Sequence, residues 1–332
     1  MNAVAETSPR APVAAPHPTH TFKLLLRREF WEHKGGFVWA PLIVSGIAIL
    51  FTLLGVTAGT LIGKQNYIGP DGAAEQSGEI AQLAGAVGDG ALLGGIGLAM
   101  IVLAFVVFFY SLGSLYDDRR DRSILFWKSM PISDTQMVLS KLAWALVLAP
   151  LVALAVGLAT GLVMWVIAAL TTTVNGVPGG SGVFLHSHPF QIIGNVLLFL
   201  PVQILWSLPA VGWLMLCSAW SKRVPFLWAV MVPILACALI SFTGIFPGVS
   251  IPHDHLWYTV VYRGLLSVVP GAWLPTVSDH LEDLDGPESI PQLLDPSVTL
   301  QVLAEADVWI GVAIGAAMIY GAIRLRRWRD EG

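Results

Sequence analysis

Residues 115–142, LYDDRRDRSILFWKSMPISDTQMVLSKL, form a charged segment between two long apolar runs at residues 92–112 and 143–170. The segment begins with a cluster of mixed sign: Asp117, Asp118, Arg119, Arg120, Asp121 and Arg122. Four apolar residues and a lysine come next: Ile124, Leu125, Phe126, Trp127 and Lys128. This pattern predicts a short amphipathic helix at a membrane surface, held there by a membrane-spanning helix on either side.

The composition places the rest of the chain in a membrane. Of its 332 residues, 55% are hydrophobic and only 12% are charged, against roughly a quarter charged in soluble domains. Six runs have about the 20 apolar residues that a bilayer core requires, at residues 37–62, 92–112, 143–170, 192–220, 226–245 and 308–323. Lipid offers no partner to the backbone of an open sheet, so the fold class is an all-α integral membrane protein with six transmembrane helices.

Lysine and arginine fall mainly on one side of these spans. When the spans are threaded alternately, 16 of the 18 basic residues lie on one side, and only Lys64 and Arg263 lie on the other. Basic residues near short loops remain in the cytoplasm. We therefore expect both termini on the cytoplasmic side of a bacterial-type cytoplasmic membrane. The first apolar run is too long for a signal peptide, so we expect it to be retained as an anchor.

The N-terminal part divides into two stretches. Residues 1–20 are rich in Ala and Pro and predict a disordered cytoplasmic tail. Residues 21–34 then place apolar and basic side chains on different helix faces, at Phe22, Leu25, Leu26, Arg27, Arg28 and Phe30. This predicts a helix that lies in the membrane interface and ends at Gly35 and Gly36. The alternative is that these residues simply lead into the first span.

Two outer segments are expected. Residues 66–90 predict an acidic outer loop between the first two spans. Residues 246–307 predict a longer segment before the last span. Its aromatic first half suits re-entrant or interfacial helices that partly enter the outer leaflet, and its acidic second half suits a solvated cap.

Local signals add detail to the spans. Ser133 and Gln136 have the spacing of a capping box, so the third spanning helix is expected to start near Ser133. Small residues four apart permit close helix contact, within this chain or with a second copy, and occur at Gly55 and Gly59, Gly157 and Gly161, and Gly311 and Gly315.

The sequence offers little catalytic chemistry. Gly63-Lys64 is followed by Gln65 and lies on the outer side, so no phosphate-binding G-x-x-x-x-G-K-[ST] loop is present. The spans carry no acidic or basic residue at their middle, which argues against a secondary transporter. Four outer histidines could supply imidazoles to Zn or Cu if their loops met, but isolated surface histidines are the preferred interpretation of His186, His188, His253 and His255. We predict neither a metal site nor an enzyme.

In layout the chain resembles the permease subunits of ABC-2 type exporters. The resemblance covers residues 21–329 as a single transmembrane domain and rests on four features. These are the N-terminal interfacial helix, six spans with both ends inside, the helix in LYDDRRDRSILFWKSMPISDTQMVLSKL, and the outer segment before the last span. Many members have Glu followed by Gly-Thr, whereas this chain has Asp117, Asp118, Asp121 and then Ser123. The resemblance therefore implies the location of the inner helix but no particular salt bridge.

The resemblance implies partners. In that family the inner helix is a coupling helix that docks on a separate cytoplasmic ATPase, and two permeases, identical or related, join two ATPases. Residues 117–128 would then be the coupling segment, and ATP and Mg would bind the partner, with no cofactor in this chain and no nucleic acid. The expected function is export of a hydrophobic or amphipathic molecule along a path between the two permeases. Membrane lipid is a further expected partner. The alternatives are a membrane scaffold that recruits an ATPase without carrying substrate, and a metal-handling component.

Overall fold

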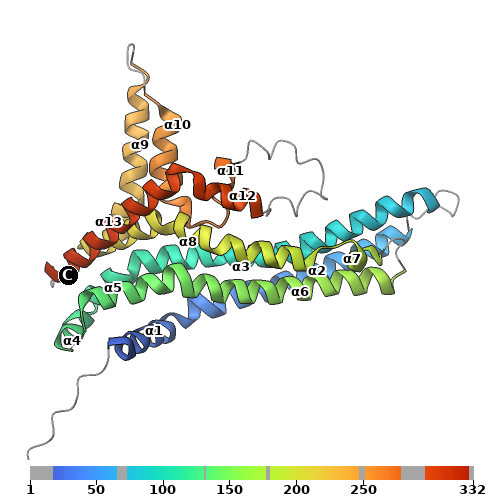
Figure 1. The fold of residues 1–332 in the computed structure, drawn as a ribbon, viewed down its shortest axis with the longest axis horizontal. Coiled ribbons are helices and arrows are strands. Elements are labelled where there is room, and N and C mark those ends of the chain that lie inside the picture. The colour runs from blue at the N-terminus through green and yellow to red at the C-terminus, as the bar shows by residue number, and fades with distance from the viewer. Residues whose placement is uncertain are drawn as a thin grey trace, which may run out of the picture.

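The computed structural model describes residues 18–65, 73–130, 132–176, 180–246, 251–277 and 296–328, and every regular element among them is helical. An elongated bundle contains α2 (Ala40–Gln65), α3 (Ala73–Arg120), α6 (Ala149–Val174) and α8 (Pro189–Trp220). A second group stands at an angle to it (Figure 1), with α9 (Val232–Thr243), α10 (His253–Trp257) and α13 (Ala306–Trp328). Among the described residues, five helices are long and apolar enough to cross a membrane, consistent with an all-α, multi-pass membrane protein.

Shorter elements connect these helices. At one end of the bundle lie α1 (Pro18–Lys34), η1 (Gly35–Trp39), α4 (Ser123–Ser129), α5 (Asp134–Ala143) and η3 (Trp144–Leu148). Elsewhere are α7 (Gly182–Leu185), η4 (Leu227–Met231), η5 (Tyr258–Arg263), η6 (Leu266–Val268), α11 (Leu274–Val277), α12 (Pro296–Gln301) and η9 (Val302–Ala304).

Five of the six predicted spans lie in the long apolar helices, which are Thr19–Ile62, Gln82–Arg120, Asp134–Val174, Pro189–Trp220 and Ala306–Trp328. The remaining one, residues 226–245, corresponds to the shorter apolar helix Leu227–Thr243, formed by η4 and α9. That helix rises about 26 Å, slightly less than a hydrocarbon core of about 30 Å.

The predicted outer loop at residues 66–90 is wrong for most of its length. From Ala73 the chain is already helical, and α3 continues without interruption for 48 residues to Arg120. Such a helix is about 72 Å long, more than twice the thickness of a hydrocarbon core. The polar residues of its first turns misled the prediction, because a helix that projects beyond the membrane needs no apolar periodicity.

Glycines allow α3 and α6 to pack closely. A Cβ added at Gly95 of α3 would lie 2.5 Å from the backbone of Gly161 in α6, and one added at Gly161 would clash with the carbonyl oxygen of Leu92. Gly157 lies against Ile96 in the same way, with only 3.0 Å between an added Cβ and the Ile96 Cα. The small-residue pair at Gly157 and Gly161 therefore serves contact within the chain.

Glycines also allow α8 and α13 to pack closely. A Cβ at Gly212 of α8 would lie 2.7 Å from the carbonyl oxygen of Gly315, and one at Gly315 would lie 2.8 Å from the Leu208 backbone. The third pair differs, since no described atom lies within 4 Å of a Cβ added at Gly55 or Gly59.

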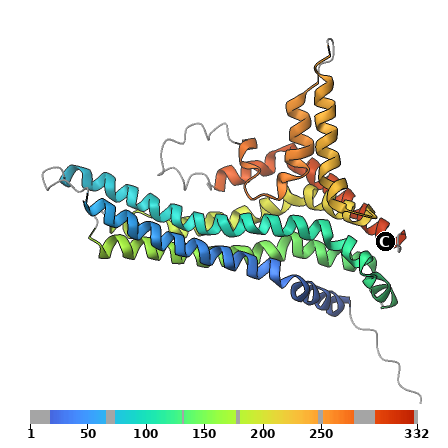
Figure 2. The same cartoon turned by 180° about the vertical axis from the view of Figure 1, so that it is seen from behind.

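The chain then forms a helical hairpin that stands away from the bundle in both views (Figures 1 and 2). Its first arm is η4 and α9, and its second is α10 and η5, which the Trp257 indole joins to the Ser241 hydroxyl at 3.0 Å. The described part of the predicted outer segment contains short helices, namely α10, η5, η6, α11, α12 and η9. Their entry into the outer leaflet stays a prediction. The acidic cap falls mainly on residues 278–295, outside the described residues.

The N-terminal prediction is adjusted at both ends. Residues 18–20, placed in the disordered tail, are the first turn of α1, while residues 1–17 lie outside the described part. Non-helical dihedrals at His33 (φ −112°, ψ 16°) bend the chain just before Gly35 and Gly36, where α1 gives way to η1 and α2. The predicted change of direction is therefore present, two residues before Gly35.

Candidate functional site

The short helix α4 is set apart from α3 by an unusual backbone turn. Arg122 has φ 57° and ψ 11°, in the left-handed region, which costs a non-glycine residue about 1–2 kcal/mol. The turn ends α3 and redirects the chain into α4, and the Ser123 hydroxyl donates to the Asp118 carbonyl at 3.2 Å across it. A single helix over residues 117–128 is therefore wrong: Asp117 to Arg120 form the last turn of α3, and α4 holds only Ser123–Ser129.

The predicted coupling residues consequently face in two directions. Asp118 and Arg119 are buried, with 4% and 5% of their surfaces exposed, so they are not available to a partner as predicted. Ile124 is also buried, whereas Leu125 and Phe126 are 58% and 59% exposed. The remaining charged residues are exposed: Asp117, Arg120, Asp121, Arg122 and Lys128.

Asp118 belongs to a set of buried and half-buried ionic residues that we call the inner charge network: Arg28, Glu29, Asp118, Asp134, Lys141 and Arg326. The Lys141 ammonium lies 3.0 Å from Glu29 Oε1 and 3.5 Å from Asp118 Oδ1. Arg326 Nη1 lies 3.0 Å from Asp118 Oδ2, and Arg326 Nε lies 3.3 Å from Asp134 Oδ1. The network holds three acidic and three basic groups, and it ties α1, α3, α5 and α13 together.

Burial makes this network costly to break. Glu29, Asp118, Lys141 and Arg326 are each no more than 4% exposed. The Tyr110 hydroxyl adds a hydrogen bond of 2.8 Å to Glu29 Oε2. Removing one member of a buried ion pair leaves the other charge without compensation, at a cost of about 3–5 kcal/mol, so these four helices are held in one arrangement.

Arg119 fastens the end of α3 to the end of α8. Its guanidinium Nη2 donates to the Ser218 carbonyl at 2.5 Å and to the Ser221 carbonyl at 2.9 Å. The last carbonyls of a helix lack partners within the helix and attract cations. Arg119 therefore stabilises the α3–α8 contact from within.

Two contacts fix α4 to this framework. The Arg28 guanidinium lies 4.0 Å from the centre of the Trp127 ring, a cation–π contact between α1 and α4. After α4, the capping box that opens α5 is present as predicted, with Ser133 accepting from the Gln136 amide at 3.2 Å and the Gln136 side chain accepting from the Ser133 amide at 3.3 Å.

Helix α1 packs inward on the face predicted to meet the membrane. The Trp144 indole donates to the Leu26 carbonyl at 2.7 Å, and the Phe30 and Trp144 rings stack with centroids 5.6 Å apart. Leu25 is buried, Phe22 and Leu26 are half-buried, and the basic Arg27 is exposed. Their apolar stripe therefore contacts η3 and its neighbours, while Leu24 and Trp31, 53% and 60% exposed, form the outward face.

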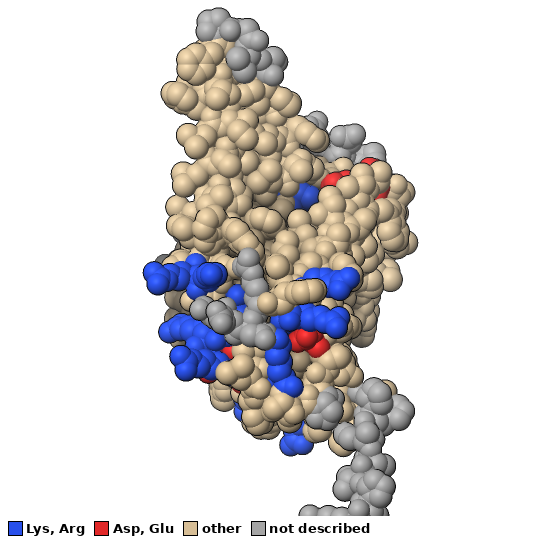
Figure 3. Space-filling model, turned by 90° about the vertical axis from the view of Figure 1, so that its left-hand side faces the viewer, with Lys and Arg blue, Asp and Glu red and all other residues tan. Residues whose placement is uncertain are grey.

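The end of the molecule around α4 is basic. Lys and Arg side chains gather at this end of the molecule (Figure 3). Exposed basic residues of α1, α3, α4, α13 and the turns after α3 and α8 include Lys23, Arg27, Arg120, Arg122, Lys128, Lys222, Arg223, Arg324 and Arg327. A hollow of about 630 Å³ lies beside α4, with Lys128, Arg324 and Arg327 among its lining residues. This surface combines two exposed apolar side chains, Leu125 and Phe126, with positive charge.

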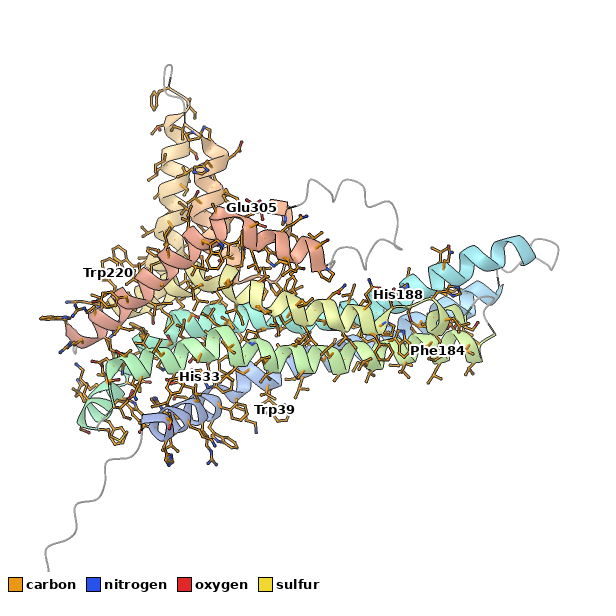
Figure 4. All side chains as sticks on the ribbon, in the orientation of Figure 1. His33, Trp39, Phe184, His188, Trp220 and Glu305 are labelled. Atoms are coloured by element: carbon orange, nitrogen blue, oxygen red, sulfur yellow. The ribbon has the colours of Figure 1, made fainter. Side chains whose placement is uncertain are left out.

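The histidines do not converge. His188 lies at the start of α8, far along the bundle from the hairpin whose α10 contains His253 and His255 (Figures 1 and 4). Its Nδ1 lies 3.1 Å from Asp89 Oδ2, and its backbone amide donates to Asp89 Oδ1 at 2.7 Å. His186 caps the end of α7. Within the described residues no three His, Cys, Asp or Glu side chains group as metal ligands.

Four members of the inner charge network were missed at the sequence level: Glu29, Asp134, Lys141 and Arg326. Lys141 and Arg326 had entered only the count of basic residues. A signal existed for Glu29, because it follows Phe22, Leu25 and Leu26 on one helical stripe, at the i+7 position of a face that is otherwise apolar. No family model matches the chain, and comparison with curated proteins and with solved structures finds no significant similarity.

Proposed function

We propose that the chain is the permease subunit of an ATP-driven exporter of the ABC-2 type, in which α4 is the contact for a cytoplasmic ATPase. One observation carries the proposal: a short helix exposes Leu125 and Phe126 at the basic end of the molecule while its base is fixed to buried ionic residues of four helices. An exposed apolar pair rimmed by charge is typical of a protein-binding surface.

The fixed base gives α4 a means of transmitting force. A partner that displaces α4 also pulls on Arg28 through Trp127 and on Asp118 through the Ser123 hydrogen bond. Both residues contact the inner charge network, whose ion pairs resist separation because the unpaired charges would remain buried. The displacement therefore reaches α1, α3, α5 and α13 together.

Energy for transport comes from the partner in this proposal. The chain lacks a phosphate-binding loop, so ATP and Mg bind two ATPase subunits, each opposite one of two permease copies. The excess of Lys and Arg around α4 favours a cytoplasmic position for this end and for both termini, in a bacterial-type cytoplasmic membrane. The substrate class is a hydrophobic or amphipathic molecule.

The test is recovery of the ATPase. The tagged full chain, solubilised in mild detergent after crosslinking in its native membrane, is expected to bring down a protein with a phosphate-binding loop. Replacing the apolar pair by Leu125→Ser with Phe126→Ser should reduce this recovery about tenfold, as loss of about 1.4 kcal/mol of binding energy would. Val224→Asn is the matched control, because Val224 is also exposed (59%) and its positive φ of 46° tolerates asparagine.

Two results would overturn the proposal: no ATPase in the crosslinked material, or equal recovery with the α4 double variant and with the wild type. A scaffold that recruits an ATPase without carrying substrate predicts recovery too. The variant Asp118→Asn separates the two, because it disrupts the inner charge network but leaves the α4 surface intact. If the chain is a scaffold, this variant should leave the ATP turnover of the purified complex unchanged. If the chain is a coupled permease, the ATP turnover should change.

A further inference from the structure

A cavity of about 300 Å³ lies at the base of the hairpin, between η5, α8 and α13. Its walls are mostly apolar and include Pro209, Trp213, Pro233, Ile310, Ile314 and Met318. The volume is at the lower end of the range for small-molecule sites, about 300–1,000 Å³. The cavity is open on one side, because Ile310 and Ile314 in its wall are 57% and 46% exposed.

The backbone and the side chains around the cavity keep it open. Pro209 lies inside α8, where its ring removes one helical hydrogen bond. Gly264 and Gly311 line the cavity without side chains, and a Cβ added at Gly311 would clash with the Arg263 guanidinium. The neighbours that could close the space are fixed, because α8 and α13 already touch at Gly212 and Gly315.

One end of the cavity is polar. Arg263 is 5% exposed, its Nη1 donates to the Trp206 carbonyl at 2.5 Å, and its guanidinium lies 3.7 Å from the centre of the Trp206 ring. Its Nε lies 3.3 Å from Asp307 Oδ2, which also accepts from the Tyr258 hydroxyl at 2.8 Å. Burial raises the pKa of Tyr258 and the hydrogen bond to Asp307 raises it further, so this hydroxyl keeps its proton.

The polar end carries no net charge. Arg263 and Asp307 neutralise one another, and a ligand with its own net charge would have to break their ion pair in a partly desolvated place. The Asp307 side chain is nevertheless 40% exposed, so its carboxylate remains accessible to a donor on a ligand. The site thus favours a hydrogen-bonding head without charge over an ionic head.

We propose that this cavity is a binding site for an uncharged amphiphile, a molecule with a slender apolar body and a hydroxyl or amide head. The head would lie at Arg263 and Asp307, and the body would follow α13 from Asp307 to Met318, a rise of about 16 Å. This site is separate from the α4 surface and does not depend on an ATPase.

The experiment uses the full chain in lipid nanodiscs and three photoreactive probes of equal chain length: a diazirine-bearing long-chain alcohol, the matching carboxylic acid and the matching amine. The alcohol is expected to label peptides of α8 and α13 around the cavity about tenfold more than either charged probe. Ile314→Trp, which fills the cavity, should remove this labelling, while Ala316→Trp on the exposed opposite face of α13 should retain it.

A charge variant tests the polar end. Asp307→Asn leaves Arg263 unpaired, so the preference should shift from the alcohol to the carboxylic acid probe. Equal labelling by all three probes in the wild type, or full labelling of Ile314→Trp, would overturn the proposal and assign the signal to bulk lipid. A neutral lipid retained through purification would identify the membrane as the source of the occupant, and labelling of an initially empty site would identify a passing molecule; both support the same site chemistry.

Discussion

Helix α13 is attached at each end by a guanidinium–carboxylate pair, and the two pairs differ in their surroundings. At the C-terminal end, Arg326 of α13 meets Asp118, with side chains 2% and 4% exposed. At the N-terminal end, Asp307 of α13 meets Arg263, with side chains 40% and 6% exposed, beside a cavity. The first pair is buried, whereas the second pair faces a space that a ligand can enter.

The comparison shows how one type of interaction serves two purposes. Asp118 and Arg326 are shielded from water, so each charge depends on its ionic partners and both side chains hold their positions. A pair with one exposed carboxylate can exchange a partner for water or for a ligand donor at small cost. We infer that the C-terminal end of α13 is rigid and that its N-terminal end can respond to an occupant.

The largest effect is expected from Asp118→Asn. The substitution removes the negative charge between Lys141 and Arg326, and the loss in free energy of unfolding should be about 3–5 kcal/mol. Thermal unfolding followed by tryptophan fluorescence in detergent measures it. Asp117→Asn, the exposed neighbour on the same turn, should change stability by no more than about 0.5 kcal/mol. Equal effects at the two positions would refute the enclosed network.

A smaller loss in free energy of unfolding is expected from Arg263→Gln, at the N-terminal end of α13. The variant removes charge-assisted hydrogen bonds to the Trp206 carbonyl and Asp307, worth about 2 kcal/mol, but Asp307 can then be hydrated. The same unfolding measurement, with exposed Arg223→Gln as control, tests this order. If Arg263→Gln destabilised the chain more than Asp118→Asn, the contrast between the two ends of α13 would fail.

The smallest loss is expected from Gly311→Ala. The added methyl group clashes with the end of the flexible Arg263 side chain, which can move, so the cost should be about 1 kcal/mol. At Gly315 the obstacle is the Leu208 backbone, so Gly315→Ala should cost more. Gly59→Ala, with open space around it, should be neutral or slightly stabilising. A Gly311→Ala cost matching that of Gly315→Ala would show that Arg263 is held rigidly.

The capping box at Ser133 and Gln136 was predictable, because it needs only residues three apart. The small-residue pairs were less reliable, because Gly157 and Gly161 contact a neighbouring helix whereas no described atom lies near Gly55 and Gly59. The segment boundaries were less predictable. Hydropathy could not reveal that α3 begins at Ala73, because the first turns of this helix precede the apolar run. It also could not reveal that Arg122 adopts a left-handed conformation and separates α4 from the charged residues before it.

The candidate sites were predictable in part. The segment around Leu125 and Phe126 was identified because charged residues interrupt the apolar sequence there. The sequence did not show which of these charged side chains are buried, since Asp118 is buried and its neighbour Asp117 is exposed. Arg263 was read as an isolated outer charge, yet it lies against Trp206, 57 positions away in the chain.

Composition and local periodicity were sufficient to identify an all-helical, multi-pass membrane protein with a charged segment between two of its apolar helices. The physical reason is that lipid accepts only helices that satisfy their own hydrogen bonds. Which charges meet could be learned only from the packing of the helices. Glu29, Asp118, Lys141 and Arg326 come from four separate helices, and ion pairing across such distances in the chain depends on how those helices pack, which no local pattern encodes.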